Sequence, residues 1–442
     1  MSDWFGIAPA WEYALIAPVV ASILGLMALV RLAAARSGLS PEVQRKIVHV
    51  AVGLTALSFP WLFSGPGPVF ALMAVAIAVM LLLRRRQIGS VLHSVERPSY
   101  GEIYMALVIA LLFFRSQDDP LLYVLPMLVI TLSDTASALV GTTYGRLRFP
   151  VEDGHKSVEG VVAFFMVTMI VSMCVLLLMS DAGRLNVIML ALMIAVFGAL
   201  VEADSWRGLD NLFVPAGAHL LLARHLETSP ELLVLLALLF SAVVFIALRY
   251  AHLIGLTRHA ARAYTILVFL ILSVVTPINA ALPVVAILAH LAARQMNPCR
   301  SRRPDLDLLA ASTGVALVWL LVGEGAGLTA INMFNATFAG VAIAFALLAA
   351  IGPGAARSRM LAVGAALLFA AVVAWIGIGV AWMNPPGTRW YGEPWPPVLA
   401  TLALVAVPTL LWPRWFAAYR SPKVFAVAGA APATFFLTGA LA

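Results

Sequence analysis

Long apolar runs recur along the whole of this 442-residue chain, and they limit its fold more strongly than any other feature. A run of roughly 20 apolar residues is long enough to cross the hydrocarbon core of a bilayer as one helix. Inside lipid, a helix satisfies its backbone hydrogen bonds within its own segment. We therefore expect an all-α, polytopic integral membrane protein with about sixteen transmembrane helices, near 13–33, 47–64, 68–83, 102–115, 121–141, 158–180, 184–201, 212–224, 231–249, 264–277, 279–293, 307–322, 329–351, 361–382, 397–412 and 423–441.

The composition excludes an ordinary soluble domain. Hydrophobic residues make up 62% of the chain and charged residues 11%, against about 45–50% and about 25% in soluble domains. Cys174 lies in an apolar run and Cys299 in an arginine-rich loop, so we expect neither a disulfide nor a thiolate metal site. The formal net charge of +7 would suit nucleic acid, but the placement of the basic residues indicates membrane topology instead.

The basic residues predict how the chain is oriented. If the N-terminus lies outside, the cytoplasmic loops contain all of the 28 lysines and arginines except Arg115, Arg184, Arg224 and Arg389. This excess is the positive-inside pattern, so we expect an N-terminus outside and a site that faces the cytoplasm. Arginine outnumbers lysine and alanine is frequent, as in proteins of GC-rich genomes, which favours a bacterial inner membrane.

The acidic residues divide the chain into two parts. One third of the 21 acids lie on the predicted cytoplasmic face of one short region, namely Asp134, Glu152, Asp153, Glu159, Glu202, Asp204 and Asp210. Beyond residue 250 there are only Asp305, Asp307, Glu324 and Glu393. We therefore expect a catalytic membrane domain at 1–250 and an additional helical membrane domain at 251–442, to which the sequence assigns no function.

Asp134 stands near the end of a predicted span, in "SDTASALVGTTYG" (133–145). An ionised carboxylate in a span is usually paired or functional, whereas an aspartate at a helix end can simply reach water. On a helix, Asp134, Ala138 and Gly141 share a face, and the two small residues leave room for a ligand or another backbone. Both interpretations stay open from this motif alone.

The stretch "HKSVEG" (155–160) opens the next span and carries Lys156, one of three lysines in the chain. An ammonium group beside a helix N-terminus suits phosphate oxygens, and Glu159 is expected on roughly the same face. The alternative is plain helix capping by Ser157 and Glu159. Just before it, "GTTYGRLRF" has two glycines that either cradle phosphate or end a helix, and it supplies Gly141, Gly145, Arg146 and Arg148.

Two further motifs bring polar side chains to the same face. "EADSWRGLDNLFVP" (202–215) is either a solvated loop or a set of hard oxygen ligands for a magnesium ion shared with a polyphosphate, through Glu202, Asp204, Asp210 and Asn211. "RKIVHVAVGL" (45–54) holds Lys46 and His49 as i, i+3 neighbours, either in the site or as positive-inside flanks. Together the motifs indicate an Mg-nucleotide site, where catalysis is mostly positioning and charge neutralisation.

Four of these motifs follow one another along the chain as "RKIVHVAVGL", "SDTASALVGTTYG", "KSVEG" and "EADSWRGLDNLFVP". In this order they resemble the polyprenol kinase family, which includes dolichol kinase and phytol kinase. The resemblance covers about residues 40–225. It implies a CTP-dependent membrane enzyme that phosphorylates a long isoprenoid alcohol held in the bilayer, with CTP as donor and Mg²⁺ or another divalent cation as cofactor. The two central motifs also look like those of CTP:phosphatidate cytidylyltransferase, but that family's Asp-Arg-x-Asp signature is absent here.

The resemblance also implies a role for each motif residue. Asp134 and Asp210 would hold the divalent ion or activate the hydroxyl, and Lys156 would neutralise the nucleotide phosphates. Glu159 and Glu202 would support them in catalysis. The nucleotide would be bound by Gly141, Gly145, Arg148, Ser157 and Asn211, with Lys46 and His49 as further contributors.

Two other functions stay open as alternatives. A cytidylyltransferase acting on a lipid phosphate would release pyrophosphate, whereas a kinase would release CDP. A transporter would fit the number of spans, but transport pathways usually need ionisable residues at mid-depth, and here they gather at the cytoplasmic ends. The sequence does not identify the alcohol, the role of residues 251–442 or the oligomeric state.

Overall fold

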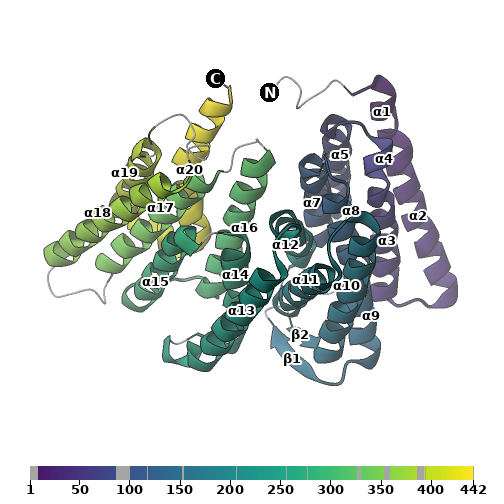
Figure 1. The fold of residues 1–442 in the computed structure, drawn as a ribbon, viewed down its shortest axis with the longest axis horizontal. Helices are drawn as coiled ribbons and strands as arrows, with labels where there is room; N and C mark the ends of the chain where they lie inside the picture. The colour runs from purple at the N-terminus through teal and green to yellow at the C-terminus, as the bar shows by residue number, and fades with distance from the viewer. Residues whose placement is uncertain are drawn as a thin grey trace. The chain divides into compact units, whose positions relative to one another are not determined.

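The chain consists of two compact helical units, Met1–Ala242 and Val243–Ala442 (Figure 1). Each unit is described by itself. The computed structural model describes residues 8–85, 100–116, 118–151, 154–205, 207–254, 256–275, 277–325, 330–352, 359–385, 393 and 395–441. The sequence pattern places the division near residue 250, a few residues beyond the boundary between the two units.

Ten helices among the described residues are long and apolar enough to cross a membrane, and two shorter apolar helices, His259–Ile271 and Trp395–Leu411, add to them. The chain is therefore a helical integral membrane protein. The count of sixteen spans stays a prediction, because several of the expected spans form helices of 17 residues or fewer. The outward N-terminus also stays a prediction.

The first unit begins with helices whose ends follow local sequence signals. Gly38 ends the second helix with a left-handed φ of 66°, a conformation that glycine adopts without strain. Ser40 then caps the third helix by accepting a hydrogen bond from the Val43 amide at 3.4 Å, with Pro41 at the first helical position. The unit's helices are α1 (Ala10–Ala14), α2 (Ile16–Ser37), α3 (Pro41–Leu57), α4 (Phe59–Leu62), α5 (Pro66–Arg85), α7 (Gly101–Arg115), α8 (Leu121–Leu128), η1 (Val129–Ser133), α9 (Asp134–Tyr144), α10 (Val158–Met179), α11 (Arg184–Asp204), α12 (Asp210–His225) and α13 (Pro230–Tyr250), the last of which crosses into the second unit.

One long helix changes its winding just before Asp134. It runs as α8, passes through the π-helical segment η1 and continues as α9, whose first residue is Asp134. A π-helical turn holds one more residue than an α-helical turn and often lies at a functional site. The sequence predicts an uninterrupted span here, so the π segment is a new feature.

The polar loop after α9 contains a short antiparallel hairpin, the exception to the all-α expectation. Strand β1 (Arg148–Val151) pairs with β2 (Gly154–Ser157), with Arg148 opposite Ser157. The Val158 amide donates to the Leu147 carbonyl at 2.9 Å and extends the pairing to the start of α10. Residues 152 and 153, two of the acids expected on the cytoplasmic face, lie outside the described residues.

Small residues allow the helices around the hairpin to pack closely. A Cβ added at Gly160 on α10 would lie 2.9 Å from the Ser137 carbonyl oxygen on α9, and a Cβ added at Gly198 on α11 would lie 2.7 Å from the Phe164 ring. Real Cβ atoms essentially never come this close. These glycines therefore set the spacing of α9, α10 and α11.

The second unit is built around a central buried helix, α17. Almost all of α17 is buried, and it packs against α15, α16, α18, α19 and α20. The second unit's other elements follow the end of α13, namely η2 (Ala251–Ile254), α14 (Arg258–Val274), η3 (Pro277–Ala280), α15 (Ala281–Met296), α16 (Pro304–Gly325), α17 (Ile331–Ala350), α18 (Arg359–Met383), α19 (Trp395–Leu411), η5 (Pro413–Ala417) and α20 (Arg420–Leu441).

Four buried asparagines join three regions of the second unit. The Asn335 side-chain amide donates to Asn279 Oδ1 at 2.5 Å, and the Asn384 amide lies within 2.9 Å of both Asn279 Oδ1 and Asn332 Oδ1. Hydrogen bonds between polar side chains are a common means of association between helices in lipid. The network therefore ties η3, α17 and the end of α18 together.

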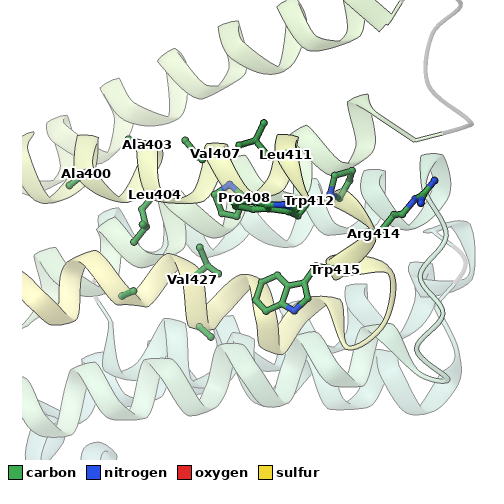
Figure 2. Close-up of a pocket in the computed structure, with 13 residues that line it drawn as sticks. Ala400, Ala403, Leu404, Val407, Pro408, Leu411, Trp412, Arg414, Trp415 and Val427 are labelled. Carbon is green, nitrogen blue, oxygen red and sulfur yellow. The ribbon is translucent and has the colours of Figure 1, made fainter.

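An apolar pocket of ≈ 1420 Å³ lies between α19 and α20 (Figure 2). Leu404, Val407 and Val427 line its middle, while Trp412 and Trp415 lie toward one end with Arg414. Tryptophan and arginine of this kind are typical of the level at which a membrane meets water.

Candidate active site

Three carboxylates from three helices converge in the first unit. Asp134 begins α9, Glu202 lies in the last turn of α11 and Asp210 begins α12. One oxygen atom from each carboxylate lies within 4.8 Å of the others, with Asp134 and Glu202 buried and Asp210 half-buried. The sequence offered all three as candidate ligands or supporting residues, and the structure brings them together.

Lys46 and His49 reach this cluster from α3. Lys46 Nζ donates to Asp134 Oδ2 at 2.5 Å, and only 2% of the Lys46 side chain is exposed. His49 Nε2 lies 3.3 Å from the same oxygen and 3.3 Å from the Ile130 carbonyl in the π segment. Their i, i+3 spacing brings both side chains to the Asp134 carboxylate, and their role in a nucleotide site stays a prediction.

Lys156 makes the second ion pair of the site. Its Nζ lies 3.0 Å from Glu202 Oε1, also donates to the Glu202 backbone carbonyl, and lies 3.3 Å from Ser205 Oγ. Burial lowers the pKa of Lys156, but the nearby Glu202 and Asp210 carboxylates raise it by more than burial lowers it. The pKa therefore lies above the ordinary lysine value. Lys156 therefore carries a positive charge at neutral pH.

The charges and the uncompensated oxygens of the site fit a divalent cation. Asp134 is paired with Lys46 and Glu202 with Lys156, while Asp210 makes no hydrogen bond or ion pair with any residue that the structure describes. Glu202 Oε2 is buried with no hydrogen-bond partner in the described part of the chain. Hard oxygen ligands in this number suit Mg²⁺, which binds one or two carboxylates together with water and phosphate oxygens.

A strained turn precedes Asp210 and sets its direction. Gly208 has a φ of 83°, and Arg207 has a φ of 55°, which is uncommon for a residue other than glycine. The Arg207 carbonyl accepts a hydrogen bond from the Tyr100 amide at 3.0 Å. Strain of this kind persists where the surrounding structure holds it, often at functional sites.

Asn211 follows directly on α12 and is buried. Its amide nitrogen lies 3.5 Å from the Gly208 carbonyl, and its Oδ1 has no hydrogen-bond partner among the described residues. An unpaired buried carbonyl oxygen is costly unless something binds it. Asn211 Oδ1 is therefore available to a ligand, and the binding of nucleotide or metal by Asn211 stays a prediction.

Glu159 lies away from Lys156, contrary to the expected shared face. Its carboxylate accepts hydrogen bonds from the Arg146 and Leu147 amides at 3.0 Å. The shared face assumed one continuous helix, but Lys156 belongs to β2 and Glu159 to α10. Glu159 thus fastens the loop after α9, and its catalytic role stays a prediction.

The remaining predicted residues surround the base of the hairpin. Ser157 caps α10 by accepting from the Gly160 amide at 3.0 Å, which agrees with the capping alternative. A Cβ at Gly141 would lie 3.0 Å from Ser157 Oγ, and Gly145 also lies against Ser157. Arg148 is exposed on β1. The binding of nucleotide by these four residues stays a prediction.

Sequence reasoning missed Ser137 and the cavity beside the cluster. Ser137 Oγ donates to Glu202 Oε1 at 3.1 Å. Ser137 stands three residues after Asp134 on one helical face, a spacing that could have identified it. The cavity could not be found in this way, because it depends on how α2, α3, α5 and α7 pack together and no local pattern gives that packing.

The cavity has a volume of ≈ 140 Å³ and is walled by α2, α3, α5 and α7. Most of its walls are aliphatic. Polar side chains gather at one end, where Arg45, His49, Glu102 and Asn211 line it. Since His49 also contacts Asp134 and Asn211 adjoins Asp210, this end of the cavity adjoins the carboxylates.

Comparisons with known proteins find two matches to the first part of the chain. The sequence model of the Cytidylyltransferase family matches residues 5–204. A phytol kinase from Synechocystis sp. is 36% identical over 207 residues, which are 46% of this chain and 88% of that protein. No solved structure matches the chain. Because the match covers nearly the whole of the phytol kinase, the chain belongs to the polyprenol kinase family, the family of phytol kinase.

Proposed function

We propose that the first unit transfers the γ-phosphoryl group of CTP to the hydroxyl of a long-chain isoprenoid alcohol at the cytoplasmic surface of a bacterial inner membrane. The observation that carries the proposal is the convergence of three carboxylates and two lysines, next to a largely apolar cavity that His49 and Asn211 line. The similarity to a phytol kinase supports an alcohol acceptor. The resemblance of the sequence motifs supports CTP as the donor.

In this reaction the alcohol oxygen forms a bond to the γ-phosphorus while the bond from that phosphorus to the β–γ bridging oxygen breaks. The products are a prenyl phosphate and CDP. We assign the hydroxyl proton to one carboxylate oxygen of Asp210, whose other oxygen would face the cation, because Lys46 and Lys156 already pair with the other two carboxylates. Lys156, which stays protonated, faces the charge that develops on the phosphates.

A divalent cation would be held by Asp134, Glu202 and Asp210 together with phosphate oxygens. Bound there, the ion would neutralise charge on the transferring group. Lys46 and His49 would orient Asp134 through their contacts with its Oδ2. The hydroxyl would approach from the cavity, whose polar end opens at this point.

The test uses purified full-length protein in lipid nanodiscs, CTP labelled at the γ-phosphate, Mg²⁺ and a panel of farnesol, geranylgeraniol, phytol and polyprenols. We expect label in a prenyl phosphate and CDP as the other product, both lost when the divalent cation is chelated. The Asp134→Asn and Lys156→Ala variants should lose at least about a hundredfold in kcat. Glu231→Gln, an exposed acid at the start of α13, is the matched control and should keep wild-type activity.

A cytidylyltransferase is the second candidate, because the family model that matches residues 5–204 carries that description. It would act on a lipid phosphate and release pyrophosphate instead of CDP. Pyrophosphate release with a lipid phosphate, and no γ-phosphate transfer to any alcohol, would overturn the kinase proposal in favour of this one.

A further inference from the structure

The pocket between α19 and α20 is a groove in the surface of the second unit, which we call the α19–α20 groove (Figure 2). Arg414 is the one charged residue among those that line it, and the others are aliphatic residues, prolines and tryptophans. Ala403 on α19 and Ala426 on α20 are both exposed, so the groove is open to the outside. In a helical membrane protein, an open groove with this lining suits hydrocarbon chains.

The length of the groove matches one leaflet of a bilayer. Lining positions on α19 run from Ala400 to Leu411, which is about 16 Å at the rise of an α-helix and about half of a hydrocarbon core of about 30 Å. Trp412 and Trp415 follow at one end and are 61% and 48% exposed (Figure 2). Because tryptophan gathers at the level of the lipid head groups, the groove extends from that level toward the middle of the bilayer.

The volume of the groove favours a lipid with two chains. Its ≈ 1420 Å³ exceeds the range of about 300–1,000 Å³ that is usual for pockets that bind small molecules. A single slender chain would leave part of this space empty. The two acyl chains of a phospholipid fill it better.

Positive charge gathers at the tryptophan end of the groove. No Asp or Glu stands between residues 394 and 442, whereas this segment holds Arg414, Arg420 and Lys423. Arg414 is exposed and makes no hydrogen bond or ion pair with any residue that the structure describes. Lys423 Nζ donates to the Trp415 carbonyl at 2.7 Å and lies 5.2 Å from the centre of the Trp415 ring, which holds its charge beside the groove.

The acids of the neighbouring helix do not line the groove. Asp305 and Asp307 lie in the first turn of α16, which packs against α20. Asp305 is already paired, with His290 at 3.0 Å and with Arg294 at 2.5 Å. The end of the groove near Arg414 is therefore complementary to an anionic group.

We infer that the α19–α20 groove binds an anionic diacyl phospholipid of the surrounding membrane, with its phosphate beside Arg414 and Lys423 and its acyl chains between the two helices. Basic pockets between membrane helices bind anionic head groups in this way. The inference gives the second unit a lipid site of its own and does not depend on the reaction proposed for the first unit.

The test uses the full-length protein in phosphatidylcholine nanodiscs that contain a small fraction of phosphatidylglycerol with a diazirine in one acyl chain. After photolysis, the labelled peptides are identified by mass spectrometry. We expect labels near Ala403 and Ala426, and unlabelled phosphatidylglycerol should displace the probe at least about fivefold better than phosphatidylcholine. Arg414→Gln should lower the apparent affinity for the probe about fivefold, and Arg414→Gln combined with Lys423→Gln about twentyfold or more.

Matched variants separate the groove from the rest of the surface. Ala403→Phe combined with Ala426→Phe fills the groove and should remove the labels. Leu437→Phe changes a residue of α20 that is 59% exposed and does not line the groove, and Arg36→Gln removes a charge from an exposed position on α2. Both should label as the wild-type protein does. A loss in Arg36→Gln equal to that in Arg414→Gln would overturn the site, because the charge effect would then be general.

Competition identifies the occupant. Equal displacement by phosphatidylcholine and phosphatidylglycerol would overturn the inference, because the groove would then hold ordinary bilayer lipid. Better displacement by geranylgeranyl phosphate than by phosphatidylglycerol would assign the groove to a single-chain prenyl phosphate and overturn the phospholipid. Displacement by inorganic phosphate alone would show that the acyl chains contribute nothing, which also contradicts the inference.

A second readout needs no photochemistry. Cys299 Sγ lies 3.4 Å from the Ala417 carbonyl oxygen of η5, and the Arg300 amide donates to the same oxygen at 2.7 Å. Since a ligand that binds only the folded state stabilises it, phosphatidylglycerol should slow the reaction of Cys299 with a maleimide in a Cys174→Ser background. Arg414→Gln should remove this protection. Equal protection by phosphatidylcholine would count against an anionic lipid.

Discussion

At the scale of single residues, Lys46 is expected to affect both the stability of the protein and the activity of the site. It is almost fully buried in a membrane protein, and its ammonium group lies 2.5 Å from Asp134 Oδ2. A buried ion pair contributes little net stability, but removal of one partner leaves a charge that nothing compensates. Removal of Lys46 would therefore leave the buried Asp134 carboxylate without its ammonium partner.

We predict that Lys46→Ala destabilises the protein by about 3–5 kcal/mol and abolishes phosphoryl transfer. The double variant Lys46→Met with Asp134→Asn should recover much of the stability, because neither charge is then buried alone, but should recover no activity. Thermal unfolding in detergent and γ-phosphate transfer measure the two effects. A double variant no more stable than Lys46→Ala would show that the pair is not coupled.

At the scale of elements, the sequence predicts which residues belong to the site better than it predicts which residues contact one another. Asp134, Glu202 and Asp210 could be singled out because carboxylates are rare in so apolar a chain. Their convergence depends on how α9, α11 and α12 are rotated about their axes. Glycine contacts and the π segment set these rotations, and no local sequence pattern encodes them. Lys46 and Asp134 are 88 positions apart, so their pairing could not be read from spacing. The sequence analysis expected Glu159 on the same face as Lys156 because it assumed one helix, but β2 ends at Ser157 and α10 begins at Val158.

The close approach of α9 and α10 gives a prediction at the same scale. Gly160→Ala would place a Cβ 2.9 Å from the Ser137 carbonyl oxygen, a backbone atom that cannot turn aside. The two helices must separate, which moves Lys156 relative to Asp134, so we expect kcat to fall at least about tenfold. Gly25→Ala, on α2 with open space around it, is the control and should be neutral or slightly stabilising. Equal activity of both variants would contradict the packing argument.

At the scale of the whole molecule, the candidate site, the cavity and the family match at residues 5–204 all lie in the first unit. The second unit has its own buried network, in which four asparagines join η3, α17 and the end of α18. A substitution that destabilises the interior of one unit is therefore expected to leave the other unit folded.

We predict that Asn335→Leu destabilises the second unit by about 1–2 kcal/mol and leaves phosphoryl transfer in the first unit unchanged. The reporter is Cys299, a free cysteine in the second unit, in a Cys174→Ser background. Its thiol should react faster with a maleimide on heating in the Asn335→Leu variant than in its absence. A parallel loss of transfer activity at temperatures where the wild-type protein is stable would show that the units depend on each other.

The position of the cavity among α2, α3, α5 and α7 also determines how the kinetics of this protein are to be expressed. Two of these helices are membrane spans by length and composition, so an alcohol in the cavity comes from the lipid phase and not from water. Its effective concentration is then a mole fraction of the bilayer. Adding more vesicles at constant total alcohol dilutes the acceptor and slows the reaction, although nothing in the aqueous phase has changed.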